Sequence, residues 1–218
     1  MTLDDDDLTE HGLAPVQQSG RVLVLACGAL AHEITALIRL NNWQHIDLTC
    51  LPAIWHNSPE KIPEGVEKAV LKYRADYDDI FVAYADCGTG GRLKSLCDRL
   101  GVAMIAGPHC YSFFEGNAAF AAHGEDEITT FYLTDFLARQ FTTFVIRPLG
   151  LDRHPELRDA YFGHYEKLVY LAQTDDDKLD QKARAAADRL GLAYERRFTG
   201  YGDLEAALKA PANPQSRR

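Results

Sequence analysis

Short apolar runs alternate with longer amphipathic segments along most of this chain, and this alternation limits the fold more than any other feature. The runs are rich in β-branched and aromatic residues, as buried strands are, and they lie at 21–26, 46–51, 80–85, 102–106, 168–172 and 193–198. The segments between them repeat apolar residues at helical spacing, and they lie at 29–40, 59–75, 92–100, 155–165, 178–190 and 203–209. Strands that alternate with helices form βαβ units, so the sequence predicts an α/β fold with a mostly parallel, Rossmann-like sheet flanked by helices.

One further segment is predicted to be a single long helix. Residues 127–146 carry Phe131, Ala138, Phe141 and Val145 at spacings that bring these side chains near one another on a helix. The pattern therefore predicts a long helix at about 127–146, with an apolar stripe that packs on the rest of the fold.

The chain divides into three parts by composition. Residues 1–20 are predicted to be a flexible acidic leader, 21–210 a single α/β domain, and 211–218 a disordered tail. A chain of 218 residues is long enough for one large core or for two small lobes. If there are two lobes, their candidate boundaries lie near 115–127 and 147–155.

The balance of charge excludes several classes of protein. The net charge is −9, and an acidic surface does not suit a nucleic-acid binder or a protein that attaches to anionic membranes. No apolar run approaches the ~20 residues that span a bilayer, and the acidic start MTLDDDDLTEHG lacks the features of a signal peptide. We therefore expect a cytoplasmic protein whose five cysteines are free thiols, metal ligands or buried side chains rather than disulfides.

Cysteine and histidine follow the first four predicted strands, at the edge of a parallel sheet where ligands bind. These strand-end residues, together with the polar residues beside them, are Cys27, His56, Asn57, Asp86, Cys87, His109 and Cys110. Cys50 lies inside a predicted strand and Cys97 inside a predicted helix, so both are expected to belong to the core.

Three of these cysteines suit a zinc site. Cys27, Cys87 and Cys110 are predicted metal ligands, because thiolates from different loops favour a tetrahedral zinc ion. His109 or His56 is either the remaining ligand or a base. The alternative is that these are buried loop residues whose imidazoles are hydrogen-bonded by backbone carbonyls.

A glycine-rich turn follows the third predicted strand. Gly88, Thr89, Gly90 and Gly91 are predicted to bind substrate, because glycines let backbone amides converge on an anion. The turn matches neither a complete dinucleotide-binding fingerprint nor a phosphate-binding P-loop, and a tight helix start is the alternative. Cys87 would lie beside the N-terminus of the next helix, which lowers a thiol pKa.

Two further groups are predicted substrate contacts. His56 and Asn57 lie at the same sheet edge as the glycine turn. Arg153 lies in the charged segment 152–159, where it either clamps a substrate carboxylate or forms local salt bridges at the start of a helix.

Several motifs of this chain resemble one known family. The segments LACGAL, LPAIWHNSPEKI, YADCGTGG, GPHCYSFF and LTDFLARQF look like the bacterial and archaeal family named domain of unknown function sixteen thirty-eight, over residues 21–205. Members are often found beside corrinoid proteins and methyltransferases. The resemblance implies a role in corrinoid-linked one-carbon transfer, of which methionine synthesis is one case, with a corrinoid protein and methyltransferase subunits as partners.

These observations leave three hypotheses for the function. The first is a zinc-thiolate methyltransferase, or a subunit of one, that activates a small thiol substrate. The second is a non-catalytic accessory that binds a corrinoid protein or carries a small ligand. The third is an enzyme with Cys87 as nucleophile, assisted by His109 and Asp86.

Overall fold

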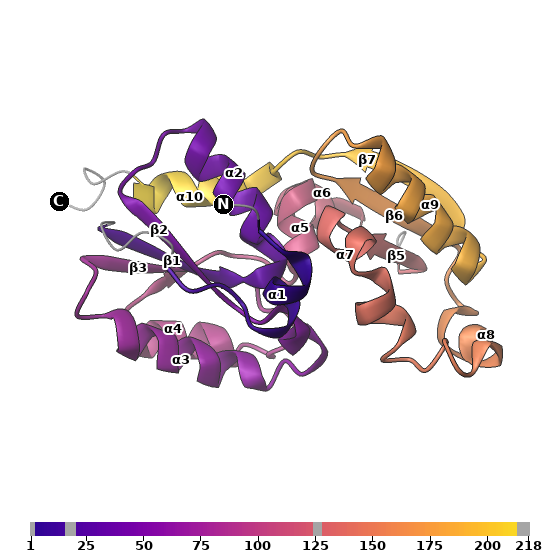
Figure 1. Ribbon diagram of the computed structural model, residues 1–218, viewed down its shortest axis with the longest axis horizontal. Coiled ribbons are helices and arrows are strands. Elements are labelled where there is room, and N and C mark those ends of the chain that lie inside the picture. The colour runs from indigo at the N-terminus through magenta and orange to yellow at the C-terminus, as the bar shows by residue number, and fades with distance from the viewer. Residues whose placement is uncertain (1–2, 16–20, 124–127, 213–218) are drawn as a thin grey trace. The chain divides into compact units, whose positions relative to one another are not determined.

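The computed structural model describes residues 3–15, 21–123 and 128–212, and it divides the chain into two compact units. Unit 1 contains residues 1–110 and 203–218, and unit 2 contains residues 111–202. Each unit has its own parallel sheet flanked by helices (Figure 1), so the prediction of an α/β fold is confirmed.

The sheet of unit 1 has the strand order β2-β1-β3-β4. The strands are β1 (Val22–Cys27), β2 (Ile46–Leu51), β3 (Asp79–Ala83) and β4 (Ala103–Met104), and all pair in parallel. Every residue of β1 is buried, because helices cover both faces of this sheet and leave no position for a solvated side chain.

The helices of unit 1 lie on opposite faces of its sheet. Helices α2 (Ala31–Leu40) and α10 (Gly202–Ala212) cover one face, and α3 (Lys61–Tyr73) and α4 (Arg92–Leu100) cover the other (Figure 1). The chain therefore leaves β1 towards β2 on one side, and crosses back over β1 to reach β3. The strand order reverses between β1 and β3, which makes the carboxyl ends of these two strands the expected ligand-binding point of unit 1.

The sheet of unit 2 has the strand order β5-β6-β7 and no such reversal. Its parallel strands are β5 (Thr130–Leu133), β6 (Lys167–Ala172) and β7 (Ala193–Phe198). Helices α7 (Asp135–Arg139) and α9 (Asp177–Leu190) pack on these strands and on each other. The remaining elements are α5 (Cys110–Glu115), α6 (Asn117–His123), η4 (Thr142–Ile146), η5 (Pro155–Leu157) and α8 (Arg158–Phe162).

Aromatic side chains of β5 reach both faces of this second sheet. Tyr132 stacks on Tyr111 of α5, with ring centroids 5.2 Å apart and an angle of 10° between the rings. Phe131, the preceding residue, meets Phe162 of α8 edge to face at 5.4 Å. Successive residues of a strand point to opposite faces, so β5 anchors helices on both sides.

The predicted long helix at 127–146 is wrong. The structure has the strand β5 at 130–133, and α7 begins only after Thr134, whose side chain accepts a hydrogen bond from the Leu137 amide at 3.3 Å. Thr134 has extended backbone angles, which end the strand and cap the helix. The β-branched run ITT before Phe131 favours a strand, and pairing with β6 outweighed the helical spacing of the apolar residues. Residue 127 lies outside the described residues.

The expected lobe boundaries also differ from the structure. The units divide after residue 110 and after residue 202, and the segments 115–127 and 147–155 both lie within unit 2. The chain builds two sheets where the prediction favoured one. Helix α10 follows unit 2 in the chain but belongs to unit 1. Local composition does not predict such packing between segments far apart in the sequence.

Part of the predicted flexible leader is folded. Helix α1 (Asp5–Glu10) is capped by Asp4, whose carboxylate accepts hydrogen bonds from the amides of Asp6 and Asp7 at 3.0 Å each. Leu8 is only 1% exposed, and Leu13 pairs with Cys50 of β2 through two backbone hydrogen bonds of 2.9 and 2.8 Å. This segment therefore covers the carboxyl ends of β1 and β2.

The ends of the chain fall partly outside the described residues. Residues 1–2 and 16–20 of the predicted leader are among these, as are residues 213–218 of the predicted tail, whereas α10 extends to Ala212. No helix among the described residues is both long and apolar enough to cross a membrane.

Candidate functional site

The loop after β3 is built around the carboxylate of Asp86. This carboxylate accepts hydrogen bonds from the Thr89 hydroxyl at 2.7 Å, from the Gly91 amide at 2.7 Å and from the Gly90 amide at 3.0 Å. Burial raises the pKa of Asp86, but these three hydrogen bonds, with a smaller contribution from His109, lower the pKa overall. Asp86 is therefore an ionised group that shapes the turn.

Glycine is needed in this turn because the backbone enters the left-handed region. Gly88, Gly90 and Gly91 have φ of +81°, +62° and +81°. The amides of Gly90 and Gly91, which were predicted to bind an anionic substrate, donate instead to the protein's own carboxylate. The anion bound by this turn is thus the Asp86 carboxylate. The main effect of the turn is to fix the position of Cys87.

Cys87 itself adopts a left-handed backbone conformation, with φ of +47°. This is uncommon for a residue with a Cβ atom and is frequent at functional sites. The conformation is held by Asp86 on one side and by a neighbouring loop on the other. The amide of Asp86 donates to the Gly107 carbonyl and the amide of Cys87 donates to the Pro108 carbonyl, each at 3.0 Å.

These two hydrogen bonds bring the loop after β4 against the loop after β3, and the sulfur of Cys87 faces hydrogen-bond donors from both. The thiol of Cys110 donates to it, and so do the backbone amides of Cys110 and Ala85. The hydrogen bond from the Cys110 thiol is the largest cause of a lowered Cys87 pKa, against the opposing effects of burial and the Asp86 charge. The site therefore favours the thiolate form of Cys87.

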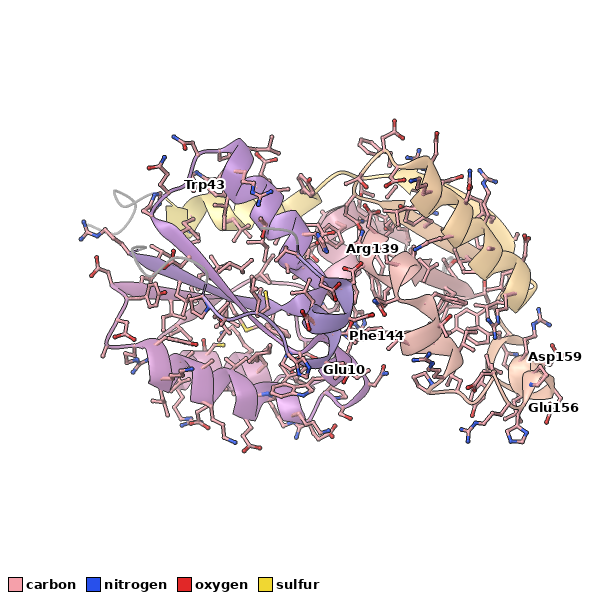
Figure 2. All side chains as sticks on the ribbon, viewed as in Figure 1. Glu10, Trp43, Arg139, Phe144, Glu156 and Asp159 are labelled. Carbon is pink, nitrogen blue, oxygen red and sulfur yellow. The ribbon has the colours of Figure 1, made fainter. Side chains whose placement is uncertain are left out.

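Three other thiols of the chain show the opposite shift, towards a higher pKa. Burial raises the pKa of Cys27 to about 12 and that of Cys97 to about 11, and it also raises the pKa of Cys50. Figure 2 shows sulfur atoms in the interior of unit 1. Cys50 and Cys97 are buried within β2 and α4, so their predicted place in the core is confirmed.

Cys27 lies close to Cys87, as the predicted convergence of strand ends requires. Burial is the largest influence on the Cys27 pKa, and the nearby charge of Cys87 raises it further. The hydroxyl of Tyr84, in the segment that follows β3, lies against the Cys27 sulfur and close to Cys87. Tyr84 was missed by the sequence analysis because its place in the apolar run 80–85 indicated only core.

Two imidazoles line the same region. His56 comes from η2 (Ala53–Asn57) and His109 from the loop after β4, and burial lowers the pKa of both. The charge of His109 also lowers the pKa of His56. The negative charge of Asp86 raises the pKa of His109 and so partly opposes the lowering by burial. Both rings are therefore neutral near pH 7, and either is able to accept a proton. Asn57, on the same 3₁₀ helix, is exposed.

The predicted zinc site has only part of the required geometry. Cys87 and Cys110 are in contact and Cys27 is near, but no group of three or more His, Cys, Asp or Glu side chains within residues 3–15, 21–123 and 128–212 is placed to hold one metal ion. The residues as arranged do not fit a zinc ion, so no chemistry is derived from one.

The predicted substrate contact Arg153 lies in unit 2, on an exposed segment. Its side chain is 75% exposed and its Nε lies 3.9 Å from an Asp152 oxygen. Glu156 and Asp159, labelled in Figure 2, extend from the same part of the chain, and His154 pairs with Glu156 at 3.2 Å. The local salt bridges expected as the alternative are present here.

A groove of about 670 Å³ lies beside the glycine turn, between α3 and α4. Its walls include Glu60 and Glu64 on one side and Gly90 and Arg92 on the other. Cys87 does not line this groove. The groove is therefore separate from the thiol site, by which we mean Cys87, Cys110 and the neighbouring Cys27.

Replacing Cys110 with alanine removes the main hydrogen bond to the Cys87 sulfur. We expect the pKa of Cys87 to rise, so that the midpoint of its alkylation by iodoacetamide moves to higher pH. A hydrogen bond to a charged group contributes about 1.5–3 kcal/mol, so the labelling rate at pH 7 should fall roughly tenfold or more. The measurement is the label on the tryptic peptide 75–92 across a pH series, with Cys110→Ser, which keeps a donor, as the matched control. An unchanged profile in the alanine variant would contradict the assignment.

Comparison with known proteins identifies a family but no activity. A family model described as protein of unknown function, DUF1638, matches residues 50–208, which include the loops of Cys87 and Cys110 and most of both units. No curated protein and no solved structure matches the chain at a significant level. Because the matched region is well over half of the 218 residues, the resemblance found in the sequence is confirmed. The chain belongs to the DUF1638 family of proteins of unknown function.

Proposed function

We propose that this chain is an enzyme, or an enzyme subunit, that uses the Cys87 thiolate as a nucleophile to accept a small group in a transfer reaction. The observation that carries the proposal is the contrast among the thiols. Cys87 has a lowered pKa, whereas burial raises the pKa of Cys27, Cys50 and Cys97. The thiolate is the nucleophilic form of cysteine, so Cys87 is the thiol suited to attack.

The position of Cys87 in the fold supports this role. It follows β3 beside the point where the strand order of unit 1 reverses, which is where open parallel sheets bind their ligands. The residue is only 7% exposed, so its sulfur is largely shielded from solvent. The Cys110 thiol and two backbone amides donate to the sulfur and stabilise it as an anion.

His109 is the acid–base group of the proposed site. Its ring is neutral near pH 7 and lies near Asp86, whose negative charge favours a protonated imidazole. It is thus able to take a proton from the substrate or solvent and to return it to a leaving group. Asp86 is a positioning residue in this scheme, because all three of its recorded hydrogen bonds hold the turn.

A methyl group is the first transferred group to test. The family resemblance supports it, since that resemblance implies one-carbon transfer with a corrinoid protein as partner. In the transfer, the sulfur of Cys87 forms a bond to the methyl carbon, and the bond from that carbon to its carrier breaks with the electron pair remaining on the carrier. The product on the protein is S-methylcysteine at position 87, from which a small thiol substrate in its thiolate form then takes the methyl group.

The test is incubation of the full chain with methylcobalamin, and separately with iodoacetamide as a general probe of nucleophilicity. Trypsin places each of the five cysteines in a different peptide, so mass spectrometry identifies which sulfur reacts. We expect peptide 75–92, which carries Cys87, to gain the label first with both reagents. Labelling by iodoacetamide without methyl transfer would reject the corrinoid donor and keep the nucleophile. If Cys87 reacts with iodoacetamide no faster than the other thiols, the proposed function fails.

Two other hypotheses from the sequence stay predictions with direct tests. Metal analysis of the purified chain, with a Cys27, Cys87 and Cys110 triple alanine variant as control, decides whether zinc is bound. A pull-down against a corrinoid protein and its methyltransferase decides whether the chain is a binding accessory. Binding of either partner by a Cys87→Ser variant as strongly as by the native chain would favour the accessory role.

A further inference from the structure

A second feature of the thiol site is the contact between Cys87 and Cys110. Their side chains share a hydrogen bond, and the Cys110 amide also donates to the Cys87 sulfur. The loops that carry them are joined by the backbone hydrogen bonds from Asp86 to Gly107 and from Cys87 to Pro108, each 3.0 Å. Two sulfur atoms are thus within hydrogen-bonding distance, in two loops that backbone hydrogen bonds join.

We propose that Cys87 and Cys110 form a redox-active pair, in which a small hydroperoxide oxidises Cys87 and Cys110 then closes a reversible disulfide. The proposal rests on the nucleophilic Cys87 of the proposed function but assigns a different reaction to it. None of the five cysteines forms a disulfide bond in this structure.

The reaction has two steps. In the first, the thiolate sulfur of Cys87 attacks one oxygen of the hydroperoxide; the O–O bond breaks, an alkoxide or hydroxide leaves, and sulfur becomes a sulfenic acid after losing two electrons. In the second, the Cys110 sulfur attacks the Cys87 sulfur, a disulfide bond forms, and the sulfenic oxygen leaves as water with the proton from the Cys110 thiol. A dithiol reductant reverses the process by thiol–disulfide exchange.

The surroundings of the pair assign the two roles. Cys87 has the lowered pKa and therefore reacts first, whereas Cys110 is the thiol that donates the hydrogen bond and attacks in the second step. Both residues are buried, with 7% and 9% exposure, and hydrogen peroxide is a small oxidant suited to such a site. Closing the bond shortens the distance between the sulfurs from hydrogen-bond contact to about 2 Å, which is a local movement of two neighbouring loops.

Cys27 is the competing partner, since it also lies near Cys87. Burial raises its pKa to about 12, and the Ala29 amide and the Tyr84 hydroxyl lie close to its sulfur. Cys110 makes two hydrogen bonds to the Cys87 sulfur and is therefore the thiol already aligned with it. The pairing of Cys87 with Cys110 is a prediction that excludes the pairing with Cys27.

The experiment treats the full chain with hydrogen peroxide, blocks the remaining thiols and digests with trypsin. Cys87 lies in peptide 75–92, Cys110 in peptide 100–139 and Cys27 in peptide 22–39, each with one cysteine. We expect a cross-linked species of peptides 75–92 and 100–139 that disappears after treatment with dithiothreitol. A matched control, Cys97→Ala, removes a buried thiol of α4 and should leave the cross-link unchanged.

A Cys110→Ser variant separates the two steps. It should form no cross-link, and dimedone should trap the sulfenic acid on Cys87. If the native chain shows no link between the two peptides at any peroxide dose, or links peptide 75–92 to peptide 22–39 instead, the proposed pair is rejected. Because iodoacetamide labelling of Cys87 is measured in parallel, that rejection leaves the nucleophilic function intact, whereas loss of both reactions removes the two proposals together.

Discussion

Replacing Cys87 with serine should abolish the rapid alkylation of this chain at pH 7. A thiol whose pKa is raised to about 12 by burial, such as Cys27, is almost entirely protonated at that pH. Cys50 and Cys97 are buried with raised pKa as well. The rate of label incorporation should therefore fall by roughly a hundredfold or more when Cys87 is absent, because the thiolate is the reacting form.

The pH profile gives a second measure of the same group. The pKa of Cys87 is lowered in the folded protein, so its thiolate persists as pH falls below the usual thiol pKa of about 8.5 and is lost only when pH falls through the lowered value. Unfolding in urea should return the labelling of peptide 75–92 to that of an ordinary cysteine. The control is Cys97→Ala, which should keep the native rate and profile. Fast labelling that survives in the Cys87→Ser variant would place the reactive thiol elsewhere.

Replacing Asp135 with alanine should cause the largest loss of stability in unit 2. Its carboxylate is 1% exposed and accepts hydrogen bonds from the Tyr170 hydroxyl at 2.7 Å, the Gln173 amide at 3.0 Å, and the Thr174 amide and hydroxyl at 3.0 and 2.5 Å. These contacts join the start of α7, directly after β5, to the end of β6. One side chain thus holds two parallel strands in register at their carboxyl ends.

The expected loss of stability arises from the hydrogen-bond donors that the Asp135→Ala substitution leaves buried without an acceptor. Tyr170 and Gln173 are 0% and 3% exposed, so their hydroxyl and amide groups would lose a charged acceptor without gaining water. Each unsatisfied buried donor costs about 1–3 kcal/mol, so we expect the free energy of unfolding to fall by about 3–5 kcal/mol. The Asp135→Asn variant keeps one acceptor oxygen. Its free energy of unfolding should therefore lie between those of the native chain and the alanine variant.

Urea unfolding followed by circular dichroism measures this loss. Asp175→Ala is the matched control, because Asp175 is in the same loop region but its side chain is 85% exposed and forms a surface ion pair with Arg196. Surface pairs contribute about 1 kcal/mol or less, so this control should change little. Equal losses in the two variants would show that the buried network around Asp135 does not stabilise the unit.

The candidate site was predictable only in part. The cysteines and histidines that follow β1, β3 and β4 were found from the strand pattern, since the carboxyl ends of parallel strands share one edge of a sheet. The pattern did not distinguish a shared metal from a pair of thiols in contact. That difference depends on which donors face the Cys87 sulfur, and two of the three are backbone amides that no sequence motif marks.

The role of Asp86 was also not predictable from the sequence pattern alone. Its place before a cysteine at a strand end indicated a catalytic carboxylate, yet its oxygens accept three hydrogen bonds within its own turn. The signal available in the sequence was the aspartate followed by Thr89, Gly90 and Gly91, which is also a pattern of a self-capped turn. The two interpretations differ only in where the backbone amides point.

The sequence by itself determined the α/β class, the parallel strands and the burial of Cys50 and Cys97, because these follow from the local periodicity of apolar residues and from the burial it demands. Only the tertiary structure decided that the chain forms two sheets, that residues 130–133 are a strand, and that the segment around Leu8 covers the ends of β1 and β2. Each of these rests on pairing between segments far apart in the chain. The energies of such pairing exceed the small local preferences that a sequence pattern records, and the same long-range contacts give Cys87 its lowered pKa.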